Sequence, residues 1–179
     1  MANTEAARDR IAFLLGLRAV RQFRPDPLPQ EVVDDLLKVA RWSGSASNRQ
    51  PWELVVIRDR ESLRALAAVE GYAHHLAGAA LGIVLVMAGE RAEQETFDEG
   101  RLSERLMLAA HAHGVGSCIG WFSGGGRDAA KGLLGIPAER LVRTALSFGY
   151  PDEEARRARQ RPAQARKPVA DIVHEERYA

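Results

Sequence analysis

The chain has little cysteine and almost no net charge. Its single cysteine, Cys118, excludes an internal disulfide framework and fits a reducing cytosol. The formal net charge is +1, so bulk electrostatics gives no reason to expect nucleic acid as a partner. The longest apolar run, residues 77–88, contains glycine and is far too short to cross a bilayer. Because the N-terminus also lacks an apolar segment with a cleavage site, we expect a cytoplasmic protein without a membrane anchor.

Several motifs that carry chemistry are missing as well. No GxxxxGK[ST] sequence occurs, which argues against a phosphate-loop nucleotidase. The closely spaced glycines of residues 114–120 follow a predicted helix instead of opening one, so they do not form a dinucleotide fingerprint. His111 and His113 face different ways on one helix, and we expect no metal site there. Cys118 lies in a predicted apolar strand, so we expect it to be a buried structural thiol. The absence of reactive side-chain clusters favours a borrowed cofactor.

The hydrophobic pattern predicts one compact domain over residues 1–179, or one protomer of an intertwined dimer. Helices are expected over residues 5–17, 29–40, 60–68 and 127–134, with a longer one from a capping box at Thr96 and Glu99 to Gly114. Strands are expected over residues 52–57, 81–87, 117–122 and 141–148. Strands separated by helices of unequal length predict a layered α/β sandwich, not a regular βαβ array.

The most informative stretch is a polar segment between a helix and a strand. It reads Ser45-Ala46-Ser47-Asn48-Arg49-Gln50-Pro51-Trp52. Its small hydroxyls and carboxamides can approach a flat polar ring closely, and Pro51 biases Gln50 toward an extended conformation. The alternative is an ordinary helix-ending turn, since serine and asparagine are common turn residues. His74 and His75 form a second polar pair, which we interpret as a partly exposed turn in preference to a ligand pair.

Two basic clusters lie near opposite ends of the chain. Arg18, Arg21 and Arg24 form the first, and Arg166 and Lys167 belong to an arginine-rich tail. Guanidinium groups hold phosphate oxygens in bidentate fashion, so the two clusters could converge on a dianionic phosphate. Taken singly, each of these side chains is equally well explained as a solvated surface charge. The tail has no interleaved aromatic residues for base stacking, which argues against nucleic acid.

Five segments together resemble the FMN-dependent nitroreductase family over almost the whole chain. Residues 18–23, Arg-Ala-Val-Arg-Gln-Phe, are similar to the family's Arg-Arg-Ser-x-Arg-x-Phe/Tyr motif, and residues 45–52 to its Pro-Ser-x-x-Asn-x-Gln-Pro-Trp motif. Residues 108–117 resemble its Leu-Ala-Ala-x-x-x-Gly-Leu-Gly-Ser run, and residues 149–151 and 166–174 match in order and position. The resemblance implies a mixed, mainly antiparallel sheet flanked by helices, and an intertwined homodimer whose C-terminal arm, residues 151–179, crosses the partner.

The resemblance also implies the positions of the site. Arg18 and the backbone at Ala19 are expected to hold the FMN phosphate and ribityl chain, completed by Arg166 and Lys167. Arg21 is expected near the flavin N1/O2 edge, and Ile119 and Gly120 against one face of the ring. The remaining cofactor contacts, some of them from the partner subunit, are expected from Ser45, Ala46, Ser47, Asn48 and Gln50.

Such a site implies NAD(P)H-dependent reduction of nitroaromatic, quinone or similar conjugated acceptors by ping-pong hydride transfer. A guanidinium near N1/O2 stabilises the anion that two-electron reduction creates, and an amide near N5 tunes the hydride-carrying atom. Two departures motivate an alternative, a flavin-binding protein without turnover. Leu17 and Ala19 replace an arginine and a serine of the family motif, which weakens the expected cofactor contacts. The stretch between Met87 and Phe97 is also short, and we expect a more open site.

Overall fold

The computed structural model describes residues 4–158 and 166–178. Arg159 and Arg161 of the basic tail lie outside the described residues. The α-helices are α1 (Thr4–Gly16), α2 (Gln30–Arg41), α3 (Arg60–Ala68), α4 (Ala92–Ala112), α5 (Gly126–Leu134) and α6 (Glu153–Ala158). The strands are β1 (Trp52–Ile57), β2 (Leu81–Met87), β3 (Gly116–Trp121) and β4 (Leu141–Gly149). Short 3-10 helices are η1 (Ala46–Asn48), η2 (His74–Gly78) and η3 (Val169–Asp171).

The four strands form one antiparallel sheet in the order β1-β2-β4-β3. β2 is central, and all seven of its residues are buried. Both of its faces are covered, which explains why the strand is a continuous apolar run and not an alternating one. β3 lies at one edge, where a single parallel bridge joins Ala19 to Ser117. β1 forms the opposite edge of the sheet.

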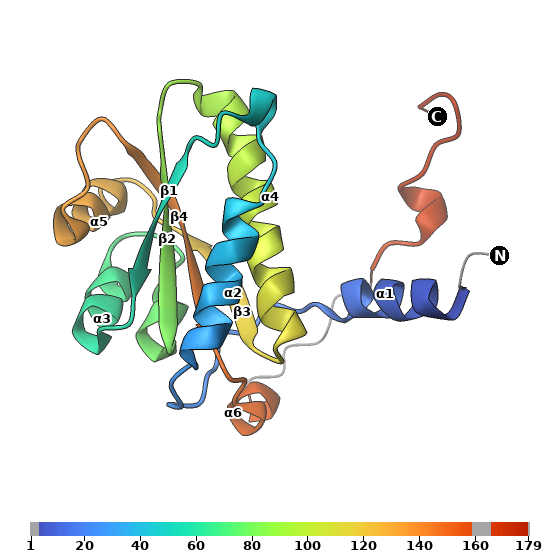
Figure 1. Ribbon diagram of the computed structural model, residues 1–179, viewed down its shortest axis with the longest axis horizontal. Helices are drawn as coiled ribbons and strands as arrows, with labels where there is room; N and C mark the ends of the chain where they lie inside the picture. The colour runs from blue at the N-terminus through green and yellow to red at the C-terminus, as the bar shows by residue number, and fades with distance from the viewer. Residues whose placement is uncertain (1–3, 159–165, 179) are drawn as a thin grey trace.

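Helices cover both faces of the sheet, α2 and α4 on one side and α3 and α5 on the other (Figure 1). The side chains of β2 alternate between two cores. Ile83 and Leu85 pack with the buried face of α2, and Val84 and Val86 pack beneath α3. α2 buries Val32, Val33, Leu36 and Ala40, the helical spacing that its sequence predicts. The predicted layered sandwich with a mainly antiparallel sheet is therefore confirmed.

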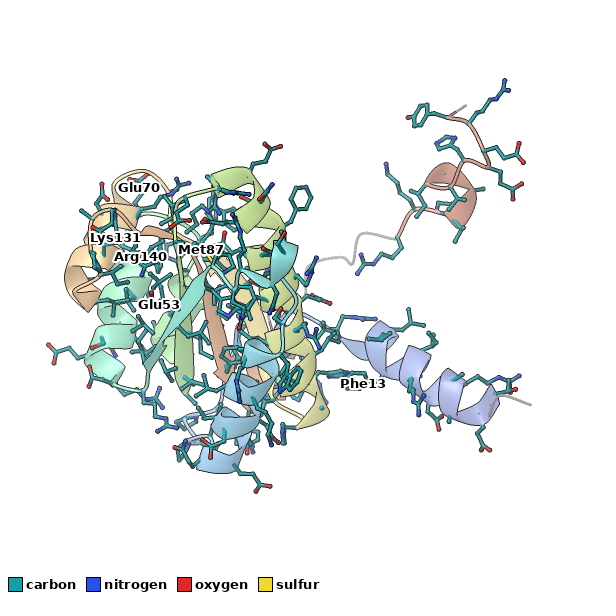
Figure 2. All side chains as sticks on the ribbon, turned by 45° about the horizontal axis from the view of Figure 1, so that its top comes forward. Phe13, Glu53, Glu70, Met87, Lys131 and Arg140 are labelled. Carbon is teal, nitrogen blue, oxygen red and sulfur yellow. The ribbon has the colours of Figure 1, made fainter. Side chains whose placement is uncertain are left out.

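The two ends of the chain project from the core on the same side (Figure 1). α1 buries none of its residues, although Ile11, Leu14 and Leu15 lie on one face as the sequence predicts. Phe13 marks the place where α1 meets the core, and its ring stacks on His111 with centroids 4.8 Å apart (Figure 2). Residues 166–178 are exposed throughout, including the apolar side chains of Val169 and Ile172. Both projecting segments therefore present apolar surface that the described protomer does not cover.

The predicted start of the long helix was wrong. α4 begins at Ala92, and Thr96 lies inside its first turns, donating its hydroxyl hydrogen bond to the Ala92 carbonyl at 2.7 Å. The side chain that organises this end is Glu95, which accepts hydrogen bonds from the backbone amides of Gly89 and Arg91 at 2.8 and 3.0 Å. Glu95 is buried because these amides take both of its oxygens. No helix within residues 4–158 and 166–178 combines the length and apolar character that a membrane crossing requires.

Candidate functional site

β3 exposes a row of backbone groups along the free edge of the sheet. The Phe122 amide donates to the Arg143 carbonyl at 2.8 Å, which fixes the phase of the β3–β4 ladder. In an antiparallel pair, alternate residues turn their amide and carbonyl away from the partner strand. The backbone groups of residues 117, 119 and 121 therefore face outward from the sheet.

Two segments cover the ends of this row and leave its middle open. The Ser117 carbonyl accepts from the Val20 amide at 2.8 Å, and the Trp121 carbonyl accepts from the Tyr72 amide at 2.7 Å. The Ile119 amide lies between them, and none of the described residues accepts a hydrogen bond from it. An unused backbone donor at a sheet edge is a ready contact for a ligand or another chain.

A cavity of about 920 Å³ opens beside this gap, and we call it the edge cavity. Its lining residues come from the segment after α1, from η2 and the residues before it, from β3 and from α6. They are Arg21, Gln22, Tyr72, His74, His75, Gly78, Ile119, Trp121 and Arg156. A volume of this size falls in the range of small-molecule and cofactor sites. The edge cavity is therefore our candidate active site.

Two aromatic side chains stand together on the wall of the edge cavity. The rings of Tyr72 and Trp121 have centroids 4.7 Å apart and are tilted by 46°. Tyr72 is 63% exposed and Trp121 is 49% exposed, so both rings are accessible from solvent beside the cavity. Glu70, two residues before Tyr72, ties this segment to the glycine turn before α5 by accepting from the Gly125 amide at 3.1 Å (Figure 2).

His75 is the lining residue with a strongly perturbed titration. Burial, followed by the positive charge of Arg21, lowers the pKa of His75 from 6.5 to about 4. The ring is therefore neutral at pH 7, and Arg21 remains the charged partner. Burial likewise raises the pKa of the Cys118 thiol, which supports a structural and not a nucleophilic role for it.

The polar segment that the sequence singled out forms a strained turn away from the edge cavity. Ser47, Asn48 and Gln50 have φ values of 52°, 52° and 50°, in the left-handed region that side-chain-bearing residues rarely occupy. The expectation that Gln50 is extended before Pro51 was therefore wrong. The Ser45 hydroxyl closes the turn by accepting from the Gln50 amide at 2.8 Å. The turn is therefore more than a helix end, because three residues within four positions hold a costly conformation.

A buried carboxylate ties this turn to α4. Asp98 is only 4% exposed and accepts from the Ala46 amide at 3.2 Å, and Arg101 balances its charge at 3.8 Å. The turn leads into β1, and the edge cavity lies along β3, so the two features occupy opposite edges of the sheet. Within the described protomer, the turn and the edge cavity do not form one site.

The predicted site residues thus fall into three groups. Arg21 and Ile119 line the edge cavity, with Gly120 directly behind it, whereas Ser45, Ala46, Ser47, Asn48 and Gln50 form the distant turn. The Arg18 guanidinium donates to the carbonyls of Leu15 and Leu17 at 2.6 and 2.7 Å, at the C-terminal end of α1. Ala19 bridges to β3, and Arg166 and Lys167 are exposed on the projecting arm. The described protomer does not assemble a phosphate site from these residues.

Sequence reasoning missed several lining residues. Tyr72, Trp121 and Arg156 were not predicted as site residues, and His75 was interpreted only as part of a polar turn. Trp121 follows Gly120 directly, and an exposed tryptophan beside a predicted site residue was an available signal. For Arg156, no local signal separated it from the other arginines of the tail.

Comparisons with known proteins establish the family of the chain and its fold. The model of the nitroreductase family matches residues 15–81, and the nitroreductase NfnB of Mycolicibacterium smegmatis is 30% identical over 192 residues, covering 78% of this chain and 82% of the relative. The chain belongs to the nitroreductase family. An FMN-dependent nitroreductase of Clostridium difficile has the same fold, with a TM-score of 0.81 at 24% identity, covering 94% of this chain and 99% of that one. The NADPH:FMN oxidoreductase of Vibrio harveyi, solved with NAD+, gives a TM-score of 0.77 at 24% identity, covering 94% and 77%.

The neutral His75 gives this nitroreductase-family protein a predicted acid sensitivity. Below pH 6.5 the unfolded chain binds a proton at His75 that the folded chain takes up only near pH 4. Its contribution to stability is therefore complete above pH 6.5 and is lost as the pH falls toward 4. We expect His75→Gln to remove about 2 kcal/mol of that loss, after allowance for the partial exposure of the ring.

Urea unfolding between pH 7 and pH 4 measures this difference. The comparison variant is His113→Gln, which changes a surface histidine beside Asp35 outside the edge cavity. A His75→Gln protein that loses stability as steeply as the wild type over this range would contradict the assignment.

Proposed function

We propose that the protein is an FMN-dependent oxidoreductase that uses NAD(P)H to reduce nitroaromatic, quinone or similar conjugated acceptors. The observation that carries the proposal is the edge cavity, which combines the Arg21 guanidinium with the unused Ile119 amide. Membership of the nitroreductase family supports it, and so do the names of structural neighbours that use FMN and nicotinamide cofactors.

The edge cavity fits the ring of a flavin by its chemistry. A flat heterocycle with acceptor atoms along one edge needs a cation and backbone donors at that edge, and Arg21 and Ile119 supply one of each. Gly120 lets η2 and the residues before it pack closely on β3 behind the cavity, because a Cβ at this position would lie 2.7 Å from the His75 ring nitrogen. When bound, FMN would supply the hydride-accepting and electron-transferring chemistry that the side chains lack.

The chain's own groups would bind and tune this cofactor. Arg21 would stabilise the negative charge that reduction places at the N1/O2 edge, and Ile119 would donate its amide hydrogen near the hydride-carrying atom. Tyr72 and Trp121 stand beside the cavity, where planar groups can pack against exposed aromatic rings. An open ring face would admit NAD(P)H and the acceptor in turn, which gives ping-pong turnover.

A second copy of the chain would complete the site. The strained turn at residues 45–50 would reach the edge cavity of the partner, and the basic residues of the arm, Arg166 and Lys167, would join the phosphate site. The uncovered apolar surface of α1 and of residues 166–178 supports a homodimer in which the arm crosses the partner subunit.

A flavin-binding protein without turnover is the second candidate. It is favoured by the engagement of Arg18 with the carbonyls at the end of α1, which leaves the first phosphate contact unassembled in the protomer. Leu17 and Ala19 offer no compensating charge or hydroxyl.

We expect the purified protein, reconstituted with FMN, to be yellow and to be bleached by NADH or NADPH under anaerobic conditions. Absorbance near the flavin band measures both binding and reduction, and addition of a nitroaromatic or quinone should restore the colour. A yellow protein that neither nicotinamide reduces would favour the non-turnover candidate. A colourless protein that fails to bind added FMN would exclude both.

Arg21→Ala should slow flavin reduction by at least about tenfold while lowering FMN occupancy less, because its charge acts mainly on the reduced anion. Stopped-flow reduction and FMN titration separate the two effects. Arg24→Ala is the matched control, since Arg24 pairs with Asp26 and lies over the Tyr150 ring outside the edge cavity. Equal losses of rate and occupancy in Arg21→Ala would show that Arg21 only holds the cofactor.

Deleting the residues after Pro168 should weaken the dimer, because it removes exposed apolar side chains that the partner would cover. Val169, Ile172, Val173 and Tyr178 are 71%, 60%, 53% and 92% exposed. Size-exclusion elution and thermal unfolding at several protein concentrations measure the change. An unchanged elution volume and melting temperature would rule out a stabilising crossing arm.

A further inference from the structure

His75 lies between the sheet and the edge cavity, and its ring contacts a strand residue. Its Nδ1 lies 2.6 Å from the hydroxyl of Ser147, a residue of β4 with no solvent exposure. Ser147 pairs with Cys118 across the β3–β4 ladder, so this hydroxyl belongs to the rigid centre of the sheet. A buried, short hydrogen bond to a rigid strand fixes the position of the ring.

The other ring nitrogen faces the free edge of β3. The Nε2 atom is buried and makes no hydrogen bond to any described residue. A Cβ on Gly120 would lie 2.7 Å from Nε2 and 2.7 Å from the Tyr72 carbonyl oxygen, so the ring packs closely against the β3 backbone at Gly120. The carbonyls of Ile119 and Tyr72 oppose the lowering of the His75 pKa, and the Ile119 carbonyl also accepts from the Cys118 thiol at 3.3 Å. A buried polar nitrogen without a settled partner is rare and calls for an explanation.

The surroundings decide which nitrogen carries the proton. A neutral imidazole has one donor and one acceptor nitrogen. A hydroxyl can donate or accept, but a carbonyl can only accept. With the Ser147 hydroxyl donating to Nδ1, a proton on Nε2 would face these two carbonyl oxygens. In the opposite tautomer, with the proton on Nδ1, the lone pair of Nε2 would face the lone pairs of the carbonyl oxygens, which is repulsive.

We propose that His75 is a positioning residue. Anchored by Ser147, it holds the Ile119 carbonyl in place at the free edge of β3. The Ile119 amide then stays directed into the edge cavity, where it donates a hydrogen bond to the bound cofactor. This inference rests on the proposed flavin function. It assigns roles to two residues, His75 and Ser147, which contact the backbone of β3 and not the reacting atoms.

The carbonyl and amide of Ile119 point to the same side of the strand. They belong to adjacent peptide units joined at the Ile119 Cα, so fixing the carbonyl leaves the amide less freedom to turn. The unsettled geometry at Nε2 is expected before ligand binding, because hydrogen bonds in empty sites are often long and tighten in the complex. Without the His75 side chain, the Ile119 amide should still be present but should be less firmly oriented toward the edge cavity.

The two redox forms of a flavin respond differently to this amide. In the oxidised ring, the nitrogen that receives hydride has a lone pair and accepts a hydrogen bond. In the reduced ring, that nitrogen carries a proton. A well-placed amide therefore stabilises the bound oxidised form more, whereas a general loosening of the fold weakens both forms alike.

The test measures FMN affinity and midpoint potential in His75→Ala, His75→Gln and Ser147→Ala. We expect His75→Ala to bind oxidised FMN about tenfold more weakly with little change for reduced FMN, which raises the midpoint potential by about 30 mV for a two-electron couple. His75→Gln, which keeps an N–H donor at the position of Nε2, should retain the wild-type potential. Ser147→Ala should shift the potential in the same direction as His75→Ala by a smaller amount.

Ser103→Ala is the matched control, because Ser103 is equally buried but bonds only within α4. Its potential and affinity should equal those of the wild type. If His75→Ala does not fold, His75→Gln and Ser147→Ala carry the test alone.

The outcomes separate the two proposals. Failure of the wild-type protein to bind FMN overturns the proposed function and this inference together. Binding by the wild type, with an unchanged potential in His75→Ala and Ser147→Ala, overturns this inference alone. Equal weakening of oxidised and reduced FMN would also overturn this inference alone, since it would show that His75 only stabilises the fold.

Discussion

The geometry of the candidate site depends on which outward-facing backbone groups of β3 are hydrogen-bonded to neighbouring segments and which are not. An edge strand offers a donor and an acceptor at every second residue, about 7 Å apart along the strand. The Val20 amide donates to the Ser117 carbonyl, and the Tyr72 amide donates to the Trp121 carbonyl. Neither segment covers the middle of the strand, at Ile119. The edge cavity forms where the two covering segments leave this gap.

Charge and burial act together at this gap. Arg21 comes from the segment that covers one end of β3, and His75 comes from the segment that covers the other. Burial keeps His75 neutral, and the nearby guanidinium adds to the cost of a second positive charge. The cavity therefore carries a fixed cation in Arg21 beside a neutral ring in His75, and the cation suits a ligand whose charge becomes more negative during a reaction cycle.

Local periodicity predicted the elements of the fold well, because most of them are stabilised by patterns that a short window contains. The bounds of β1 and β2 coincide with the predicted residues 52–57 and 81–87. The predicted start of α4 was wrong because Thr96 and Glu99 have the spacing of a capping box without forming one. The side chain that binds backbone amides before the helix is Glu95, which accepts from two of them. Arg21 and Ile119 were predicted from the family resemblance and do meet at one cavity. Tyr72, His75 and Trp121 were missed as site residues because only the cross-connection between η2 and β3 brings them together.

The strained turn shows most clearly why one protomer is not enough. Ser47, Asn48 and Gln50 each hold a conformation that costs about 1 kcal/mol or more, and Asp98 and the Ser45 hydroxyl maintain it. Such strain is usually retained where it orients groups toward a ligand. Yet β1 and β3 are separated by three strand spacings, about 14 Å, so this turn cannot contact a ring lying against Ile119 of its own chain. If the turn serves the proposed flavin site, the cavity it serves belongs to a second copy. The exposed apolar faces at both ends of the chain are the surfaces available to bring that copy into place.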